Sequence, residues 1–330
     1  MQIGFAAMLE QAPPGVVLER VQRAEAAGFR GVMASDHFQP WLPRHGAASH
    51  VWSMLGAIGT LTSGELGPGV TTPAYRTHPA VVAQAAATLG ALFPGRAWLG
   101  IGSGEALNEH IAGQYWPEAP ERIERMFEAV EVIRKLFAAS RAGRDVRHSG
   151  PFFRLESTRL WTMPQTAPDI CIATAGPHTA RRAGRVADGL VTTAGPRERL
   201  AILLERFAEG AREAGRDAGS MRRIVQLHLS WAPTDEEALA AAVAEWPLAG
   251  MRFGRADVRS PFDVEQLSRL VRPDDVAAGI VASADPDVHR AAIQGYVDLG
   301  FDRVYLHNVA SAHDEWIDVF GREVIPRIQA

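Results

Sequence analysis

The stretch FRGVMASDHFQPW at residues 29–41 decides how the rest of this sequence is interpreted. Its first part is apolar and typical of a buried strand. Its second part contains an acid, a histidine and a tryptophan at the point where the strand ends and a loop begins. Neighbouring residues of an extended chain point to opposite sides, so Asp36 and His37 can serve two different ligands. In a barrel of alternating strands and helices, chemistry is done at this edge. The stretch therefore predicts either a functional loop at a barrel mouth or, more simply, an Asp–His pair that caps the next helix.

The same alternation of strand and helix continues along the whole chain. Apolar runs with strand character lie at residues 3–8, 30–34, 66–71, 97–102, 169–174, 189–193, 223–231 and 302–308. Amphipathic helical patterns follow most of them, at residues 15–27, 79–92, 119–138, 178–186, 198–214, 235–246 and 312–328. Eight strands with intervening helices favour a (β/α)8 TIM barrel over an open doubly wound sheet. We expect residues 1–330 to form one barrel domain, with the stretches 139–167 and 247–285 as insertions over or beside its C-terminal face.

Composition narrows the class of function. The 330 residues are 47% hydrophobic and 22% charged with a net charge of −4, which suits an α/β protein without a nucleic-acid footprint. No apolar run approaches a membrane span and no signal-like segment opens the chain, so we expect a cytoplasmic protein. The single cysteine, Cys171, excludes internal disulfides and lies in an apolar run that favours burial. The single lysine, Lys135, lies in a helical pattern, which excludes a Schiff base at a strand end and a P-loop.

Two common cofactor and metal patterns are missing from the sequence. The segment GIGSGE at residues 100–105 follows a predicted strand, but its glycines do not match the dinucleotide pattern G-x-G-x-x-G. Among eleven histidines, none lies four residues from another with a carboxylate partner, as a helical zinc pair would. We therefore expect neither a Rossmann-type nicotinamide site nor a metal site.

Glycine-bearing loops follow consecutive predicted strands. They read GPGVTTP at residues 67–73, GSGEALNEH at 102–110, ATAGPH at 173–178 and TTAGP at 192–196. Glycine lets backbone N–H groups approach a flat or anionic ligand closely, and a helix N-terminus that follows suits a phosphate or polar tail. Together these loops predict one extended ligand laid across the barrel mouth.

The loop GSGEALNEH carries the most side-chain chemistry of the four. Ser103 and Asn108 offer hydrogen bonds to a ligand. We expect Glu105 at the barrel mouth, near the histidine of the opening stretch, although an acid that simply meets a helix dipole is the alternative. We interpret Glu109 and His110 in that simpler way.

Three parts of the sequence resemble one known family. The strings SDHFQPW at residues 35–41 and GSGEALNE at 102–109, together with residues 173–193, are similar to the luciferase-like barrel superfamily. Within it they resemble the F420-dependent glucose-6-phosphate dehydrogenases, and the similarity extends to VYLHN at 304–308. The resemblance implies a luciferase-like TIM barrel, a homodimer, and hydride transfer between the deazaflavin coenzyme F420 and an alcohol or carbonyl group.

The resemblance also implies roles for individual residues. His37 would be the base that takes the hydroxyl proton, Glu105 would protonate or hydrogen-bond the cofactor ring nitrogen, and Trp41 would wall the substrate pocket beside Glu10. A histidine and a carboxylate on either side of a flat ring form a sensible acid–base pair. The family pattern joins Gly69-Val70 by a non-proline cis peptide. The positions that match cofactor contacts are Asp36, Gly69, Val70, Thr72, Ser103, Gly104, Asn108, Ala175, Gly176 and His178.

The sequence departs from the family pattern where the relatives clamp a sugar phosphate. That clamp uses two lysines, a further basic residue and a threonine. Thr193 keeps the threonine as a substrate contact, but Pro196 and Ala278 occupy the lysine positions and Asp302 falls at or beside the third. Each lost charge-assisted hydrogen bond costs about 1.5–3 kcal/mol, so we expect a substrate without phosphate. Four arginines are available to replace the lost basic groups, but we expect their side chains to be solvated instead: Arg252, Arg255, Arg259 and Arg303.

Other functions remain open from the sequence. The first alternative is an FMN-dependent oxidoreductase or monooxygenase on the same barrel, because some relatives of this pattern use ordinary flavin. A cofactor-binding relative without turnover and a metal-dependent barrel hydrolase are further alternatives, but the retained His37 and Glu105 favour an active oxidoreductase. The expected partner is a small-molecule substrate, with neither nucleic acid nor membrane.

Overall fold

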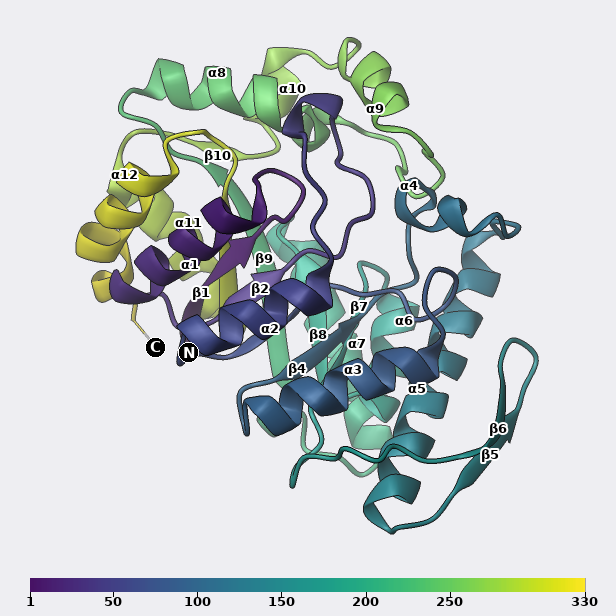
Figure 1. Cartoon of the computed structure of the whole chain (residues 1–330). Helices are drawn as coiled ribbons and strands as arrows, with labels where there is room; N and C mark the ends of the chain where they lie inside the picture. The colour runs from purple at the N-terminus through teal and green to yellow at the C-terminus, as the bar shows by residue number, and fades with distance from the viewer. Residues whose placement is uncertain (330) are drawn as a thin grey trace.

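Eight parallel strands in the computed structural model form a nearly closed barrel surrounded by helices (Figure 1). The structure describes residues 1–329, so Ala330, the last residue of the predicted domain, lies outside it. Around the barrel the strands follow the order β3-β2-β1-β11-β9-β8-β7-β4, and pairing between β3 and β4 is reduced to two isolated bridges. The predicted TIM barrel is therefore confirmed. The barrel strands are β1 (Gln2–Ala7), β2 (Val32–Ala34), β3 (Leu66–Pro68), β4 (Trp98–Ile101), β7 (Asp169–Ala173), β8 (Gly189–Thr193), β9 (Arg222–Ser230) and β11 (Arg303–Asn308).

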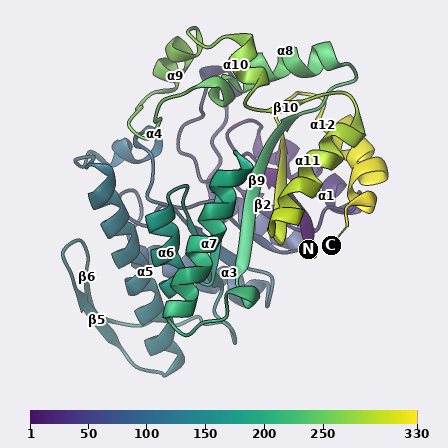
Figure 2. The ribbon, with the colours of Figure 1, turned by 180° about the vertical axis from the view of Figure 1, so that it is seen from behind.

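Helices between successive strands cover the outside of the barrel, as the view from behind also shows (Figure 2). The connecting helices are α1 (Pro14–Ala26), α2 (Val51–Leu61), α3 (Pro79–Leu92), α5 (Ala119–Arg141), α6 (Pro177–Val186), α7 (Arg197–Glu213), α8 (Asp235–Glu245) and α11 (Pro286–Leu299), and α12 (His313–Val319) follows the last strand. A short α4 (Ala106–Glu109) follows β4. None of the helices in residues 1–329 is both long and apolar enough to cross a membrane.

Among the helices that connect successive strands, the sequence analysis missed two, and it overextended the helix after the last strand. Helix α2 is largely apolar and contains two glycines, so it lacks a clear polar face. Helix α11 carried a readable signal, because Asp285 accepts a hydrogen bond from the amide of Asp287 at 2.8 Å and Gly300 ends the helix at φ +111°. The helix predicted to reach residue 328 is α-helical only through α12, and it continues as a π turn and a 3-10 turn that contains Pro326.

The insertion at residues 247–285 covers the C-terminal end of the barrel, as predicted. It contains α9 (Pro261–Ser268), α10 (Pro273–Ala277) and the short β10 (Val281–Ala282), which pairs with β9. Helices α8, α9 and α10 lie together across the end of the barrel in Figure 1. The amide of Ala106 donates to the carbonyl of Ala256 at 2.7 Å and so ties this lid to the loop after β4.

The insertion at residues 139–167 does not lie at the mouth. It forms a hairpin of β5 (Val146–Ser149) and β6 (Arg154–Thr158) along the outer side of α5, away from α8–α10 in both views (Figures 1 and 2). The buried carboxylate of Glu128 on α5 accepts the amides of Phe152 at 3.1 Å and Phe153 at 2.9 Å. A buried carboxylate needs such donors, and the hairpin is the segment that supplies them.

Two large aromatic side chains fill the lower part of the barrel. Trp98 and Tyr305 are each 1% exposed, and their ring centroids lie 6.0 Å apart. They fit because the neighbouring strands carry no side chain at Gly67 and Gly4, where a Cβ would lie 2.5 Å from Trp98 and 2.4 Å from Tyr305. Cys171 belongs to the same interior cluster, and burial raises the pKa of its thiol, which confirms the predicted buried, unreactive cysteine.

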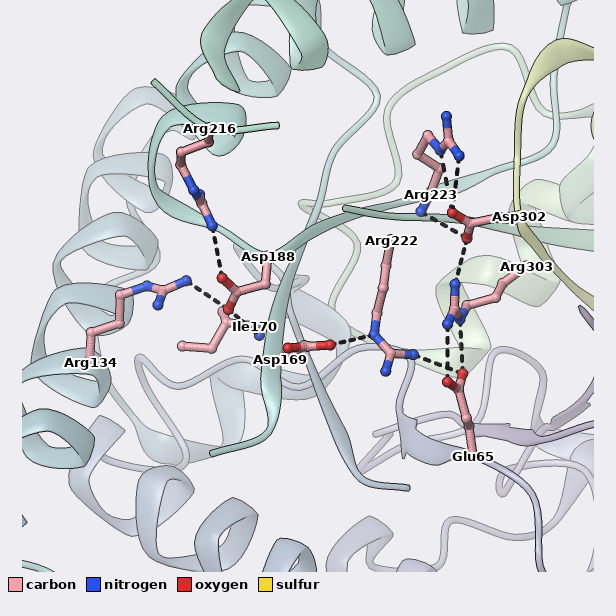
Figure 3. Close-up of polar contacts among 10 residues, drawn as sticks. All are labelled: Glu65, Arg134, Asp169, Ile170, Asp188, Arg216, Arg222, Arg223, Asp302 and Arg303. Atoms are coloured by element: carbon pink, nitrogen blue, oxygen red, sulfur yellow. Dashed lines mark hydrogen bonds and ion pairs between the residues drawn. The ribbon is translucent and has the colours of Figure 1, made fainter. Parts of the chain in front are cut away.

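A network of charges closes the N-terminal end of the barrel (Figure 3). Glu65 accepts from Arg303 Nε at 2.8 Å and from Arg222 Nη1 at 2.8 Å, and Arg222 Nε also donates to Asp169 at 2.7 Å. Burial alone would raise the pKa of Glu65, but its bonds and charge contacts with the two arginines hold that pKa below its usual value. Arg303 is therefore paired rather than solvated. Asp302 pairs with it at 2.8 Å at this end of β11, so its predicted place near a phosphate clamp at the mouth is wrong.

The glycine opposite Trp98 allows a direct test of this packing. A Cβ in Gly67→Ala would also lie 2.5 Å from the carbonyl oxygen of Trp98, so we expect the free energy of unfolding to fall by about 1–3 kcal/mol. Denaturant unfolding measures this change. The matched control Gly56→Ala lies in α2 with nothing within 4 Å of its Cβ and should be neutral or stabilising by up to about 1 kcal/mol. Equal stability of the two variants would contradict the packing account.

Candidate active site

A cavity of about 330 Å³ opens at the C-terminal end of the barrel, beneath the lid. Its volume lies in the range of small-molecule and cofactor sites. The strand ends and the loops that follow them bring together most of the residues singled out in the sequence. The predicted site residues that line the cavity are Asp36, His37, Trp41, Gly69, Val70, Thr72, Ser103, Gly104, Glu105, Asn108, Ala175 and Thr193.

Three predicted site residues lie outside this lining. Glu10 is fully buried behind Ser35, whose hydroxyl donates to its Oε2 at 2.5 Å, and Ser35 rather than Glu10 faces the cavity. Gly176 precedes helix α6, with its amide bonded to the hydroxyl of Thr174 at 3.0 Å. His178 is exposed on the first turn of α6. Glu10 was predicted to line the substrate pocket, but Ser35 lies between its carboxylate and the cavity.

Asn108 holds the loop that carries the candidate base. Its Oδ1 accepts the amides of Phe38 at 2.9 Å and Gln39 at 3.3 Å. Nδ1 of His37 lies 3.2 Å from the carbonyl oxygen of Gln39, and the rings of His37 and Trp41 lie 5.3 Å apart. The amide of Asn108, predicted as a cofactor contact, therefore also positions His37.

Glu105 and Arg255 both line the cavity, although they come from two distant parts of the chain. Burial is the main cause that raises the pKa of Glu105, and the charges of His37 and Arg255 partly oppose it. Arg255 comes from the lid, donates from Nη1 to the carbonyl of Leu248 at 2.8 Å and lies 5.5 Å from the ring centre of Trp41. The prediction of a solvated Arg255 is wrong, because the lid folds this side chain into the cavity wall.

A buried network supports Asp36 from behind the cavity wall. Its Oδ2 accepts from the hydroxyl of Thr71 at 2.6 Å, and Arg76 reaches its Oδ1 at 3.3 Å. Arg76 also donates from Nε to Glu109 at 2.9 Å. Burial raises the pKa of Glu109 against the opposing charge of Arg76. Glu109 is thus a buried, paired residue of the cavity wall and not the ordinary helix charge that the sequence suggested.

The wall between β3 and β4 is low and flat. The peptide between Gly69 and Val70 is cis, as the family resemblance implied. A Cβ at Gly102 would lie 2.7 Å from Val70, and Gly104, at φ +85°, would place a Cβ 2.9 Å from Thr72. Side chains at these glycines would fill the space beside Val70, so the wall can receive a flat ring only because glycine occupies both positions.

The sequence analysis missed two neighbouring histidines, one of which lines the opposite wall of the cavity. His228 lines the cavity and stacks on Trp246, with ring centres 4.6 Å apart. Its Nδ1 lies 2.8 Å from Nδ1 of His307, whose Nε2 lies 2.7 Å from Oε1 of Gln11. Burial, together with the charge of Arg255, lowers the pKa of His228 to about 3, and burial lowers that of His307 well below its usual value. Both imidazoles are therefore neutral at neutral pH.

The alternation of residues along β9 is a sequence signal that points to His228. Residues 226 and 228 occupy alternate positions of β9, and both line the cavity. The parallel register places His228 directly beside His307 on β11. Alternation along a predicted barrel strand therefore indicates which polar residues point inward. It does not indicate which of them form a hydrogen bond with each other.

Comparison with known proteins gives consistent results. A family model described as luciferase-like monooxygenase matches residues 1–303. The F420-dependent glucose-6-phosphate dehydrogenase of Microbacterium testaceum is 35% identical over 332 residues, covering 100% of this chain and 98% of that relative. The structure of an F420-dependent secondary alcohol dehydrogenase in complex with an F420-acetone adduct has a TM-score of 0.93 and 32% identity, covering 100% of this chain and 99% of that one. The coenzyme F420 dependent tetrahydromethanopterin reductase of Methanopyrus kandleri shares the fold, with a TM-score of 0.81 at 21% identity and 99% coverage of both chains.

Because the pKa of His307 is lowered, we expect the free energy of unfolding to depend on pH. From about pH 6.5 downward the unfolded chain protonates this histidine while the folded chain does not, so acidification favours unfolding. This one proton contributes a slope of roughly 1.4 kcal/mol per pH unit. We expect His307→Gln, which cannot titrate, to lose that part of the slope between about pH 6 and pH 5. Denaturant unfolding across pH measures both slopes, and above about pH 7.5 the two proteins should run parallel as an internal control. Identical slopes below pH 6.5 would show that His307 is protonated in the folded state.

Proposed function

Because the chain belongs to the luciferase-like monooxygenase family, we propose that it is a dehydrogenase acting on an alcohol or carbonyl group of a substrate without phosphate. It is an F420-dependent oxidoreductase, and its cofactor is coenzyme F420. The observation that carries the substrate proposal is the composition of the cavity wall, which places His37 and Glu105 in one site with a single arginine. The FMN alternative rests on likeness of fold alone.

The residues of the cavity fit a flat cofactor ring. Gly69, Val70, Gly102 and Gly104 form the low wall, and the predicted cofactor contacts Asp36, Thr72, Ser103, Asn108 and Ala175 surround it. When bound there, F420 supplies the hydride acceptor for alcohol oxidation or the hydride donor for carbonyl reduction. The outer positions Gly176 and His178, at the N-terminus of α6, are proposed to hold the polar tail rather than the ring.

Two side chains move or hold protons in this proposal. Nδ1 of His37 lies 3.2 Å from the carbonyl oxygen of Gln39 and 3.3 Å from Nδ2 of Asn108. In the tautomer proposed to be active, Nδ1 donates to Gln39 and Nε2 carries the lone pair that takes the hydroxyl proton of the substrate. Glu105, whose pKa is raised by burial, is proposed to share a proton with the ring nitrogen of the cofactor. Trp41 walls the substrate side of the pocket and holds His37 by ring contact.

The basic groups at the mouth are too few for a phosphate dianion. Arg255 is the only arginine among the described residues that line the cavity, and no lysine is among them. Pro196 and Ala278, at the expected clamp positions, cap α7 and α10 and do not line the cavity. Arg252 has a side chain that is 80% exposed, as predicted, and pairs with Asp275. Charge-assisted bonds from several groups hold a phosphate, and one guanidinium does not replace them.

Substrate preference tests this function directly. Purified protein is mixed with oxidised F420 and either 2-propanol or glucose 6-phosphate, and loss of the oxidised cofactor absorbance is followed. We expect turnover with the alcohol and a kcat/KM for glucose 6-phosphate at least about tenfold lower, because the missing clamp removes more than one charge-assisted bond. A parallel incubation with FMN should give no alcohol-dependent reduction. Faster turnover of glucose 6-phosphate would overturn the substrate proposal.

Removing the proposed base should affect turnover and spare cofactor binding. We expect His37→Ala to lower single-turnover rates by about 10²–10⁴-fold, the usual worth of a positioned acid–base group. Glu105→Gln keeps the shape of the side chain and removes its carboxyl proton, so it should also slow turnover while F420 still binds. Cofactor titration before each measurement separates binding from chemistry. His50→Ala, an exposed histidine before α2, is the matched control and should behave as wild type. Full activity of loaded His37→Ala would remove this residue from the mechanism.

A further inference from the structure

The wall opposite the proposed ring site presents a histidine whose protonation is fixed by its neighbours. In the strand order around the barrel, β9 lies opposite β3, so His228 faces the Gly69-Val70 wall across the cavity. Its ring is held on Trp246 and bonded to His307. A merely structural histidine would turn both ring nitrogens toward the protein, whereas the hydrogen bond that His228 makes within residues 1–329 uses Nδ1 alone.

The bonding partners decide which nitrogen of His228 carries the proton. Oε1 of Gln11 can only accept, so Nε2 of His307 is the N–H that donates to it at 2.7 Å. A neutral imidazole has one proton, so Nδ1 of His307 carries a lone pair and accepts from Nδ1–H of His228 at 2.8 Å. Burial keeps both rings neutral. Nε2 of His228 is therefore a hydrogen-bond acceptor at the cavity.

Arg255 places donors near this acceptor. Its charge helps to keep His228 neutral, and both side chains line the same cavity. One of its N–H groups goes to the carbonyl of Leu248, and the hydrogen bonds of residues 1–329 include no other from its guanidinium. A ligand group held here must donate to His228 and can accept from Arg255. A hydroxyl does both, whereas a carboxylate cannot donate and an ammonium cannot accept.

We propose that His228 binds a second hydroxyl group of the substrate, so that the enzyme prefers a diol or polyol to a simple alcohol. This inference rests on the proposed function, in which the reacting hydroxyl meets His37. His228 takes no part in the proton transfer itself. It selects the substrate and orients it across the cavity from the cofactor wall, and His307 and Gln11 hold it in the accepting form.

Three alcohols of one carbon skeleton test the inference. With F420 as cofactor, kcat/KM is measured for 2-butanol, 2,3-butanediol and 3-hydroxybutyrate. We expect the diol to exceed 2-butanol by about tenfold, the worth of one good hydrogen bond, with most of the difference in KM. The carboxylate compound should show no preference over 2-butanol. Equal values for diol and alcohol, or a preference for 3-hydroxybutyrate, would overturn the proposal.

Variants separate recognition from a structural role. His228→Phe keeps a ring on Trp246 but removes both nitrogens. The ratio of kcat/KM for 2,3-butanediol to that for 2-butanol should therefore fall towards one. His228→Gln can again offer an oxygen acceptor and should recover part of it. His50→Phe makes the same replacement outside the cavity and should keep the wild-type ratio. A diol preference that persists in His228→Phe would overturn the assignment.

A measurement without turnover decides the same point. In protein with ¹⁵N-labelled histidine, the signals of His228 are identified by their loss in His228→Phe. We expect Nδ1 to carry the proton and Nε2 to be unprotonated, and we expect 2,3-butanediol but not 2-butanol to shift the Nε2 signal. A proton on Nε2 would overturn the inference. Failure to turn over any alcohol would count against the proposed function, and this measurement would still decide the role of His228.

Discussion

Two aromatic side chains that fill the interior of the barrel set the depth of the cavity above them. The interior of a small barrel is just wide enough for side chains to fill. Tyr305 and Trp98 fit there because the neighbouring strands carry glycine at Gly4 and Gly67. The two rings are almost completely buried and form a solid floor. Interiors this tightly packed leave no room below for a ligand, so the cavity is confined to the C-terminal end of the strands.

The two ends of the barrel use charge in opposite ways. At the N-terminal end, Glu65 is matched by Arg222 and Arg303 at bonding distance, and removing one partner of such a group would leave a buried charge alone (Figure 3). At the mouth, Glu105 has the charge of Arg255 nearby but no ion pair with it within 4.0 Å in the part of the chain described. The same residue type therefore has a lowered pKa at one end and a raised pKa at the other. The first arrangement pairs a carboxylate with two arginines, and the second buries a carboxyl group without such a pair.

The mouth also divides into two walls of different character. Glycines and Val70 make one wall flat, while tryptophan and histidine side chains make the other selective. His37 and Glu105 come from the ends of β2 and β4, on the side of the flat wall. Loops after barrel strands can change without disturbing the floor, which is how relatives on one barrel come to differ in substrate. In this chain the lid and β9 contribute Arg255 and His228 to the cavity wall.

The sequence by itself determined the order of the strands and of most connecting helices, the loops that line the cavity, and the residues His37 and Glu105 within them, because strand and helix periods and glycine sterics are local properties. It did not determine which charged side chains are buried. Arg252 and Arg255 lie three residues apart in one loop, yet Arg252 is 80% exposed and Arg255 lines the cavity. Arg76 with Glu109 and His228 with His307 likewise join segments remote in sequence. Only the tertiary structure decided these cases, because the burial and pairing of a charge depend on which distant segment covers it, and no local pattern encodes that cover.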